Sequence, residues 1–153
     1  MATIQHHEPP YTVGYFVGSL ATASINRKLS QALIKPTPDD LEFIEIPIRD
    51  LPLYNYDYDY DTDYPLQGRA LKQAIESVDA VLFVTPEYNR SMPGALKKAI
   101  DWASRPWDDN SFAGKPSAAI GGSIGAIGTA VAQQSIRSAL SFCNSPQINA
   151  PEA

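Results

Sequence analysis

The chain alternates short apolar segments with amphipathic segments, and this pattern constrains its fold more than any other feature. Apolar segments of strand length lie at 12–19, 80–84 and 116–123. Each is followed by a segment with helical spacing. The clearest helical segment, residues 66–78, leads into 80–84 and carries charged side chains on its opposite side. Alternating strands and helices predict an α/β fold, in which a parallel sheet carries helices on both faces.

The complete pattern predicts five strands and four helices in a single domain, residues 1–153, with residues 1–10 expected to be flexible. Pro47 favours an edge position for the second strand, because proline cannot donate to a strand ladder. Pro93 suits the first position of a helix. The predicted strands are 12–19, 41–48, 80–84, 116–123 and 147–149, and the predicted helices are 25–33, 66–78, 93–103 and 129–142.

Composition excludes several classes of partner and site. A formal charge of −5 argues against nucleic acid or an anionic membrane as the main partner. No apolar run approaches the roughly 20 residues that span a bilayer, and the first residues lack the pattern of a signal peptide. A lone cysteine, Cys143, is typical of a cytoplasmic protein. The only histidines, His6 and His7, lie near the start of the chain, so no metal site is expected.

Residues 54–65 concentrate five of the eight tyrosines together with four aspartates. Four carboxylates along one face of a strand would repel one another, which favours an exposed loop. The alternative is an aromatic rim at a subunit interface or at the mouth of a substrate site. A calcium loop is disfavoured, since no central glycine or closing glutamate follows the aspartates.

Three loops stand out because ligands in open α/β sheets bind beyond the carboxyl ends of the strands, where the strand order reverses. For strand order 2-1-3-4-5 that point lies between the first and third strands. The first loop, residues 18–26, is rich in small and hydroxyl residues and opens onto a helix N-terminus, which attracts anions. Ser19, Ser24 and Asn26 can donate hydrogen bonds to a phosphate, although Ser24 can instead serve only as the helix N-cap.

The second loop interrupts an apolar strand with Pro86, Glu87, Tyr88 and Asn89. Pro86 fixes the backbone, so the amides of the next three residues point in a set direction, toward the edge of a planar heterocycle. Tyr88 would add an aromatic surface. The alternative is a tight turn in which Asn89 tolerates an unusual backbone conformation. A general-acid role for Glu87 is disfavoured, because no second carboxylate or histidine is present to work with it.

The third loop, residues 121–128, contains glycines that let a ligand approach the backbone closely. It also contains the G-x-S-x-G pattern of serine hydrolases, with Ser123 at its centre. Those enzymes place an acid and then a histidine downstream of the serine, and no histidine follows Ser123. We therefore reject a hydrolase. A phosphate seat, a rigid amide edge and a glycine-lined wall together match a phosphorylated planar cofactor such as FMN.

These segments resemble the NADPH-dependent FMN reductase family, which includes bacterial chromate, quinone and azo-dye reductases. The resemblance rests on residues 18–29, 84–106 and 121–133. It implies a flavodoxin-like, doubly wound sheet that binds FMN, takes electrons from NADPH or NADH, and forms a homodimer or homotetramer. The implied acceptors are small molecules: quinones, azo compounds or metal oxyanions such as chromate. The residues implied at FMN are Ser19, Leu20, Ser24, Ile25, Asn26, Pro86, Glu87, Tyr88, Asn89 and Ser123.

No catalytic side chain is expected, because the cofactor carries the redox chemistry. The chain departs from the family at Ala21, where an arginine is usual and would give the phosphate a charge-assisted contact. It also reaches Ala153 without the last helix of the family. Two other hypotheses therefore stay open: a flavin-binding electron carrier or sensor, and a flavin-free scaffold.

Overall fold

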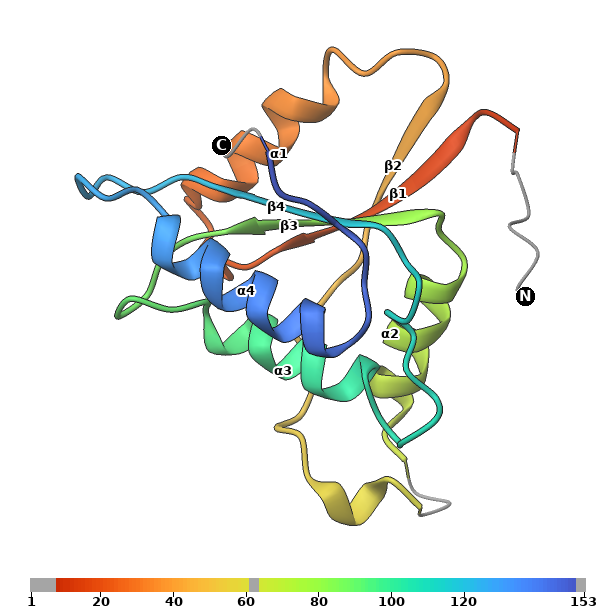
Figure 1. Cartoon of the computed structure of the whole chain (residues 1–153). Coiled ribbons are helices and arrows are strands. Elements are labelled where there is room, and N and C mark those ends of the chain that lie inside the picture. The colour runs from red at the N-terminus through yellow and green to blue at the C-terminus, as the bar shows by residue number, and fades with distance from the viewer. Residues whose placement is uncertain (1–7, 61–63, 151–153) are drawn as a thin grey trace.

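The fold is built on a five-stranded parallel sheet, as the alternation predicted, and the strand order is β2-β1-β3-β4-β5. The structure is a computed structural model that describes residues 8–60 and 64–150. The expectation that residues 1–10 are flexible falls largely outside these ranges. The order is the flavodoxin-like one, with β1 and β3 side by side at the centre (Figure 1). The strands are β1 (Tyr11–Val17), β2 (Leu41–Glu45), β3 (Ala80–Thr85), β4 (Ser117–Gly121) and β5 (Gln147–Ile148).

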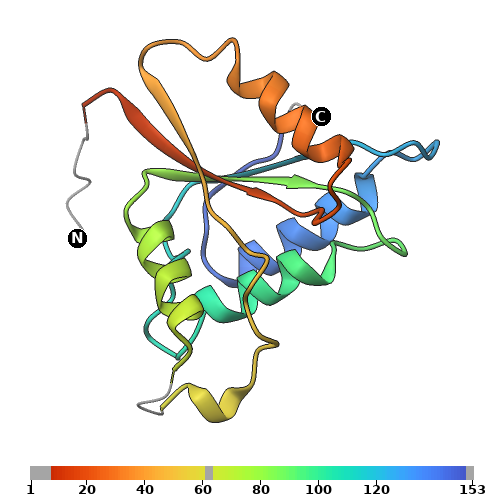
Figure 2. The ribbon, with the colours of Figure 1, turned by 180° about the vertical axis from the view of Figure 1, so that it is seen from behind.

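Helices cover both faces of the sheet. The helix after β1 lies alone on one face, while the other three lie together on the opposite face (Figures 1 and 2). Each connection runs from a strand through a helix to a parallel strand, which requires this layered arrangement. The helices are α1 (Ile25–Ile34), α2 (Leu66–Glu76), α3 (Gly94–Ala103) and α4 (Ala130–Phe142). None of the described helices is long and apolar enough to cross a membrane.

The core lies between the central strands and α2, α3 and α4. Phe16 of β1 stacks on Phe83 of β3 with ring centroids 4.8 Å apart. Trp102 of α3 is fully buried, and its indole N–H donates to the carbonyl of Pro52 at 2.8 Å. Buried indole groups usually find such a polar partner. The core is therefore continuous from the sheet to the segment that follows β2.

Four strands end one to three residues earlier than predicted: β1, β2, β4 and β5. β2 stops at Glu45, three residues before the expected end at Ile48, and β4 stops at Gly121. Pro47 has no N–H to extend the ladder, yet Ile46 still donates to the carbonyl of Tyr15 at 2.9 Å. Ile46 and Ile48 are both buried, so the chain past β2 turns its apolar side chains into the core.

The tyrosine-rich segment is only partly the exposed loop that was expected. Tyr54 and Tyr64 pack edge-on against Trp102, with centroids 5.2 and 5.1 Å away. The Asp59 carboxylate is buried and accepts hydrogen bonds from Arg105 Nε at 2.6 Å and from the Tyr54 hydroxyl at 3.0 Å. Residues 61–63 lie outside the described ranges. The described part of the segment thus has an inner side anchored to α3 and an outer side in solvent.

Candidate functional site

The loops that follow β1, β3 and β4 meet at the carboxyl edge of the sheet. Gly18 donates its backbone N–H to the carbonyl of Val84 at 2.9 Å, which continues the pairing of β1 and β3 into their loops. The Tyr88 hydroxyl lies 3.4 Å from the Ser19 hydroxyl oxygen. The first and second loops are therefore joined at both backbone and side-chain level.

Asn26 joins the first loop to the third. Its side-chain amide donates to the carbonyl of Gly122 at 3.0 Å, and its carbonyl accepts from the Gly122 N–H at 2.8 Å. Asn26 is buried, and a buried amide needs both ends satisfied. The side chain expected to bind phosphate is thus used to hold two loops together, which places Ser123 next to the first loop. The Ser123 hydroxyl accepts the N–H of Gly125 at 3.1 Å.

Ser24 is the N-cap of α1, as the alternative interpretation predicted. Its hydroxyl oxygen accepts the N–H of Arg27 at 3.2 Å. Ser19 is also buried, whereas Leu20 and Ile25 are exposed beside it. The first turn of a helix carries N–H groups with no intrahelical partner, and α1 begins at Ile25. The hydroxyls of Ser19 and Ser24 and these amides therefore lie together at the N-terminal end of α1.

Glu87 caps a different helix. Its carboxylate accepts the N–H groups of Val131 at 3.0 Å and Ala132 at 3.1 Å, in the first turn of α4. Arg90 also contacts it at 3.1 Å. Burial opposes ionisation of this carboxyl, but the hydrogen bonds from Ala132, Arg90 and Val131 outweigh burial and lower its pKa. These contacts favour the ionised form of the carboxylate, which argues against a general-acid role. The Glu87 side chain points to α4, so the backbone of Glu87, whose amide was the expected contact, is the part left to lie along a flavin.

The second loop closes in a tight turn between Tyr88 and Ser91, whose backbones exchange hydrogen bonds of 3.1 Å in both directions. Asn89 and Arg90 have φ of 51° and 62°, in the left-handed region where asparagine is favoured. The Tyr88 amide is consumed by this turn, so it is not the free donor that was expected. The Tyr88 ring is half exposed and is the part of the residue available to a ligand.

Glycine is required where the third loop begins. A Cβ on Gly121 would lie 2.1 Å from the carbonyl oxygen of Thr85 and 2.5 Å from the Thr129 hydroxyl. A Cβ on Gly122 would meet the Ile25 side chain at 3.4 Å. Larger residues would push the loop away from β3 and α1. The loop then projects Ile124, which is 95% exposed, toward solvent.

Arg49 is part of this edge and was missed by the sequence analysis. Its guanidinium Nη2 donates to the carbonyl of Leu20 at 2.8 Å. The strand order was the only signal that could have pointed to Arg49. It places β2 at the edge of the sheet beside β1, so the residues that follow β2 must lie near the loop that follows β1. No periodicity in the sequence marks that residue.

The donor set fits a phosphorylated planar group. Hydroxyls of Ser19 and Ser24, the first amides of α1 and the Arg49 guanidinium supply what a phosphate needs. The exposed Tyr88 ring and the glycines of the third loop supply a flat surface and close backbone approach.

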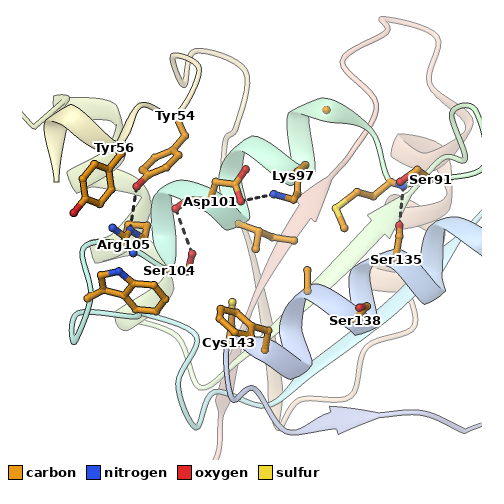
Figure 3. A pocket seen from close by; sticks show the side chains of 16 residues that line it. Tyr54, Tyr56, Ser91, Lys97, Asp101, Ser104, Arg105, Ser135, Ser138 and Cys143 are labelled. Atoms are coloured by element: carbon orange, nitrogen blue, oxygen red, sulfur yellow. Dashed lines mark hydrogen bonds and ion pairs between the residues drawn. The ribbon is translucent and has the colours of Figure 1, made fainter.

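A separate groove of about 1060 Å³ runs between α3 and α4. Figure 3 shows Lys97 and Asp101 paired along α3, with Ser135 and Ser138 on α4. It starts at Ser91, in the second loop, and continues to the end of α4, where Trp107 and Phe142 meet edge-on with centroids 6.4 Å apart. Both aromatic rings are largely exposed. The groove therefore touches the second loop at Ser91, while most of its lining lies outside the three loops.

Comparisons with known proteins agree with this geometry. The family model described as NADPH-dependent FMN reductase matches residues 11–153. A 2-hydroxy-1,4-benzoquinone reductase from a Burkholderia species is 49% identical over 92% of this chain and 75% of its own length. A quinone reductase from Pseudomonas putida is 45% identical over 94% of this chain and 76% of its own. The flavoenzyme NAD(P)H:(acceptor) oxidoreductase FerB from Paracoccus denitrificans superposes with a TM-score of 0.87 at 48% identity, covering 94% of this chain and 78% of that one.

Proposed function

The chain belongs to the NADPH-dependent FMN reductase family, and from this premise we propose that it is a quinone reductase whose three joined loops hold FMN. Like the other members of this family, it is an NAD(P)H-dependent oxidoreductase that uses FMN. The observation that carries the proposal is the joining of the loops after β1, β3 and β4 by Asn26, Tyr88 and Gly18. That edge is where the strand order reverses and where such folds bind ligands.

In this proposal the phosphate of FMN lies at the first loop. Ser19 and Ser24 contribute hydroxyls, and Ile25 and Asn26 contribute backbone amides from the first turn of α1. Leu20 lies at the outer side of the same loop. The ribityl chain and the ring system lie along residues 86–89, with the Tyr88 ring as the side-chain contact, and Ser123 closes the opposite side.

The protein's part is binding and orientation. When bound, FMN supplies the hydride and electron transfer. Pro86 and the Tyr88–Ser91 turn hold the second loop rigid, and Asn26 holds the third loop against the first. Among the described residues, the Glu87 carboxylate is bound to the first turn of α4, so we assign it no acid or base role at this edge.

Quinones are the acceptor class that the surface favours. The exposed side chains around the edge are mostly apolar or aromatic, and a planar, weakly charged acceptor would bury them. They are Leu20, Ile25, Tyr88, Ile124 and Ile127. Azo compounds share this flat shape and are included in the proposal; metal oxyanions such as chromate are included as acceptors that need only approach the flavin.

The test is spectroscopic first and kinetic second. The purified protein, supplied with FMN, should show the absorption of a bound flavin and should quench its fluorescence. It should then oxidise NADPH or NADH continuously while a benzoquinone is present. A single reduction without turnover would indicate an electron carrier instead, and failure to bind FMN would indicate a flavin-free scaffold.

Two further features belong to the proposal. A homodimer or homotetramer is supported by the exposed Trp107 and Phe142 beside the groove between α3 and α4, since large exposed apolar surfaces mark interfaces. A cytoplasmic location is supported by the single cysteine, Cys143, which is buried and free. Mass measurement in solution and cell fractionation test these two points.

A further inference from the structure

The first loop has no cation of its own. Residues 18–26 read GSLATASIN and contain neither lysine nor arginine. A phosphate monoester carries close to two negative charges at neutral pH, and the partial charge of one helix end balances only part of that. The loop therefore needs a cation from elsewhere in the fold. Arg27 follows the loop directly, Arg49 contacts it, and Arg90 lies in the second loop.

Two of these arginines are already paired. Arg27 makes a bidentate contact with Glu45, with both nitrogen–oxygen distances at 2.8 Å, and so is held toward β2. Arg90 contacts Glu87, whose carboxylate caps α4. Each guanidinium balances a carboxylate, so neither adds net positive charge at the first loop.

Arg49 contacts the loop directly. Its Nη2 donates to the carbonyl of Leu20, the third residue of the loop, over 2.8 Å. Ile48 and Leu51 are buried on either side, which fixes the backbone from which the side chain extends. A guanidinium carries five N–H donors, so one bond to a carbonyl leaves others for an anion.

We propose that Arg49 supplies the positive charge that recognises the phosphate group of FMN at the first loop. This inference rests on the proposed binding of FMN and adds a specific claim: Arg49 makes the protein select FMN over riboflavin, which lacks the phosphate. Because Arg49 is exposed, salt screens its effect, and the effect is moderate in size.

The test compares the dissociation constants of FMN and riboflavin, measured by quenching of flavin fluorescence. Arg49→Gln should weaken FMN binding by about tenfold, which is about 1.4 kcal/mol, and change riboflavin binding by less than about twofold. Arg49→Lys keeps the charge and should retain most of the preference for FMN. Added salt should reduce the difference in FMN dissociation constant between wild type and Arg49→Gln, because salt screens the charge of Arg49.

Matched controls remove the same charge nearby. Arg27→Gln and Lys28→Gln alter the first two turns of α1 and should leave the ratio of the two constants within about twofold of wild type. Thermal unfolding of each variant without flavin checks that it is folded.

Three results would overturn the inference. If Arg49→Gln binds FMN as tightly as wild type, Arg49 has no role in binding the phosphate. If the variant binds FMN and riboflavin more weakly by the same factor, Arg49 only positions the loop. Loss of FMN preference in Lys28→Gln instead would assign the cation to α1. These outcomes leave the proposed function standing, whereas a wild-type protein that binds neither flavin would refute that function and this inference together.

Discussion

At the scale of single residues, polar side chains at the loop edge mostly bind other parts of the protein. Asn26 holds Gly122, Ser24 caps α1 and Glu87 caps α4. Each of them satisfies a backbone group that would otherwise be left unpaired as the loops pack together. The groups that remain for a ligand are therefore backbone amides, the hydroxyls of the first loop and the Tyr88 ring.

Glu87 gives a prediction about pH. Its folded-state pKa is lowered, so its contribution to stability is complete above the unfolded-state pKa of about 4.3 and is lost as the pH falls through the lower folded value. Glu87→Gln should therefore lower the free energy of unfolding at pH 7, and its difference from wild type should shrink below about pH 4. Urea unfolding across this pH range measures it.

The matched control is Glu42→Gln, which removes the same charge from an exposed position on β2. At pH 7 and at pH 3, this variant should have nearly the same free energy of unfolding as wild type. A Glu87→Gln penalty that stays constant from pH 7 to pH 3 would show that the charge of the carboxylate does not stabilise α4.

Asp59 gives a second residue-scale prediction. Its side chain is fully buried and that of Arg105 is 11% exposed, so removing the negative charge leaves an uncompensated buried cation. Asp59→Asn should lower the free energy of unfolding by about 3 kcal/mol. Asp57→Asn, an exposed neighbour in the same segment, should change it by less than about 0.5 kcal/mol. Equal effects in chemical denaturation would contradict this account.

At the scale of elements, the end of β4 decides how the third loop leaves the sheet. Gly121 is the last residue of β4, and a side chain there would collide with the backbone carbonyl of Thr85 in β3. Backbone cannot move aside as a flexible side chain can, so the strand itself must shift. The register of β3 and β4 at the candidate site thus depends on this glycine.

Gly121→Ala should therefore lower the free energy of unfolding by about 1–3 kcal/mol and also weaken FMN binding. Gly94→Ala is the control, because a Cβ there meets nothing within 4 Å and Gly94 begins α3. That change should be neutral or stabilise by up to about 1 kcal/mol. Thermal unfolding and flavin titration measure both. Equal stability of the two variants would show that the loop adapts without cost.

At the scale of the whole molecule, the exposed aromatic end of α4 predicts self-association. Phe142 is 79% exposed and meets Trp107 beside the groove between α3 and α4. If this face pairs with a second copy, Phe142→Lys should place a charge in the interface and shift the mass in solution toward the 16.7 kDa of one chain. Light scattering after size exclusion measures it.

The control for this change lies on the other face of the sheet. Leu33→Lys alters an exposed apolar residue of α1, which is on the opposite face from α4 (Figures 1 and 2). It should leave the mass unchanged. A wild-type protein already at the mass of one chain, or a Phe142→Lys variant that keeps the assembled mass, would contradict pairing through this face.

The sequence by itself determined the order of the elements and the position of the three loops. Period-two and period-3.6 patterns are local, so strands and helices could be predicted from neighbouring residues. Parallel topology then brings the loops after β1, β3 and β4 to one edge without further information. The identity of Ser24 as an N-cap and the unusual backbone of Asn89 were likewise readable from residue type.

Only the tertiary structure decided what each polar side chain contacts. Asn26 and Gly122 are 96 residues apart, Glu87 and Val131 are 44 apart, and Arg49 and Leu20 are 29 apart. A local pattern carries no information about a partner at such a separation, because the contact exists only after the sheet has assembled. The same reason explains why Asp59, expected in an exposed loop, proved to be buried against Arg105.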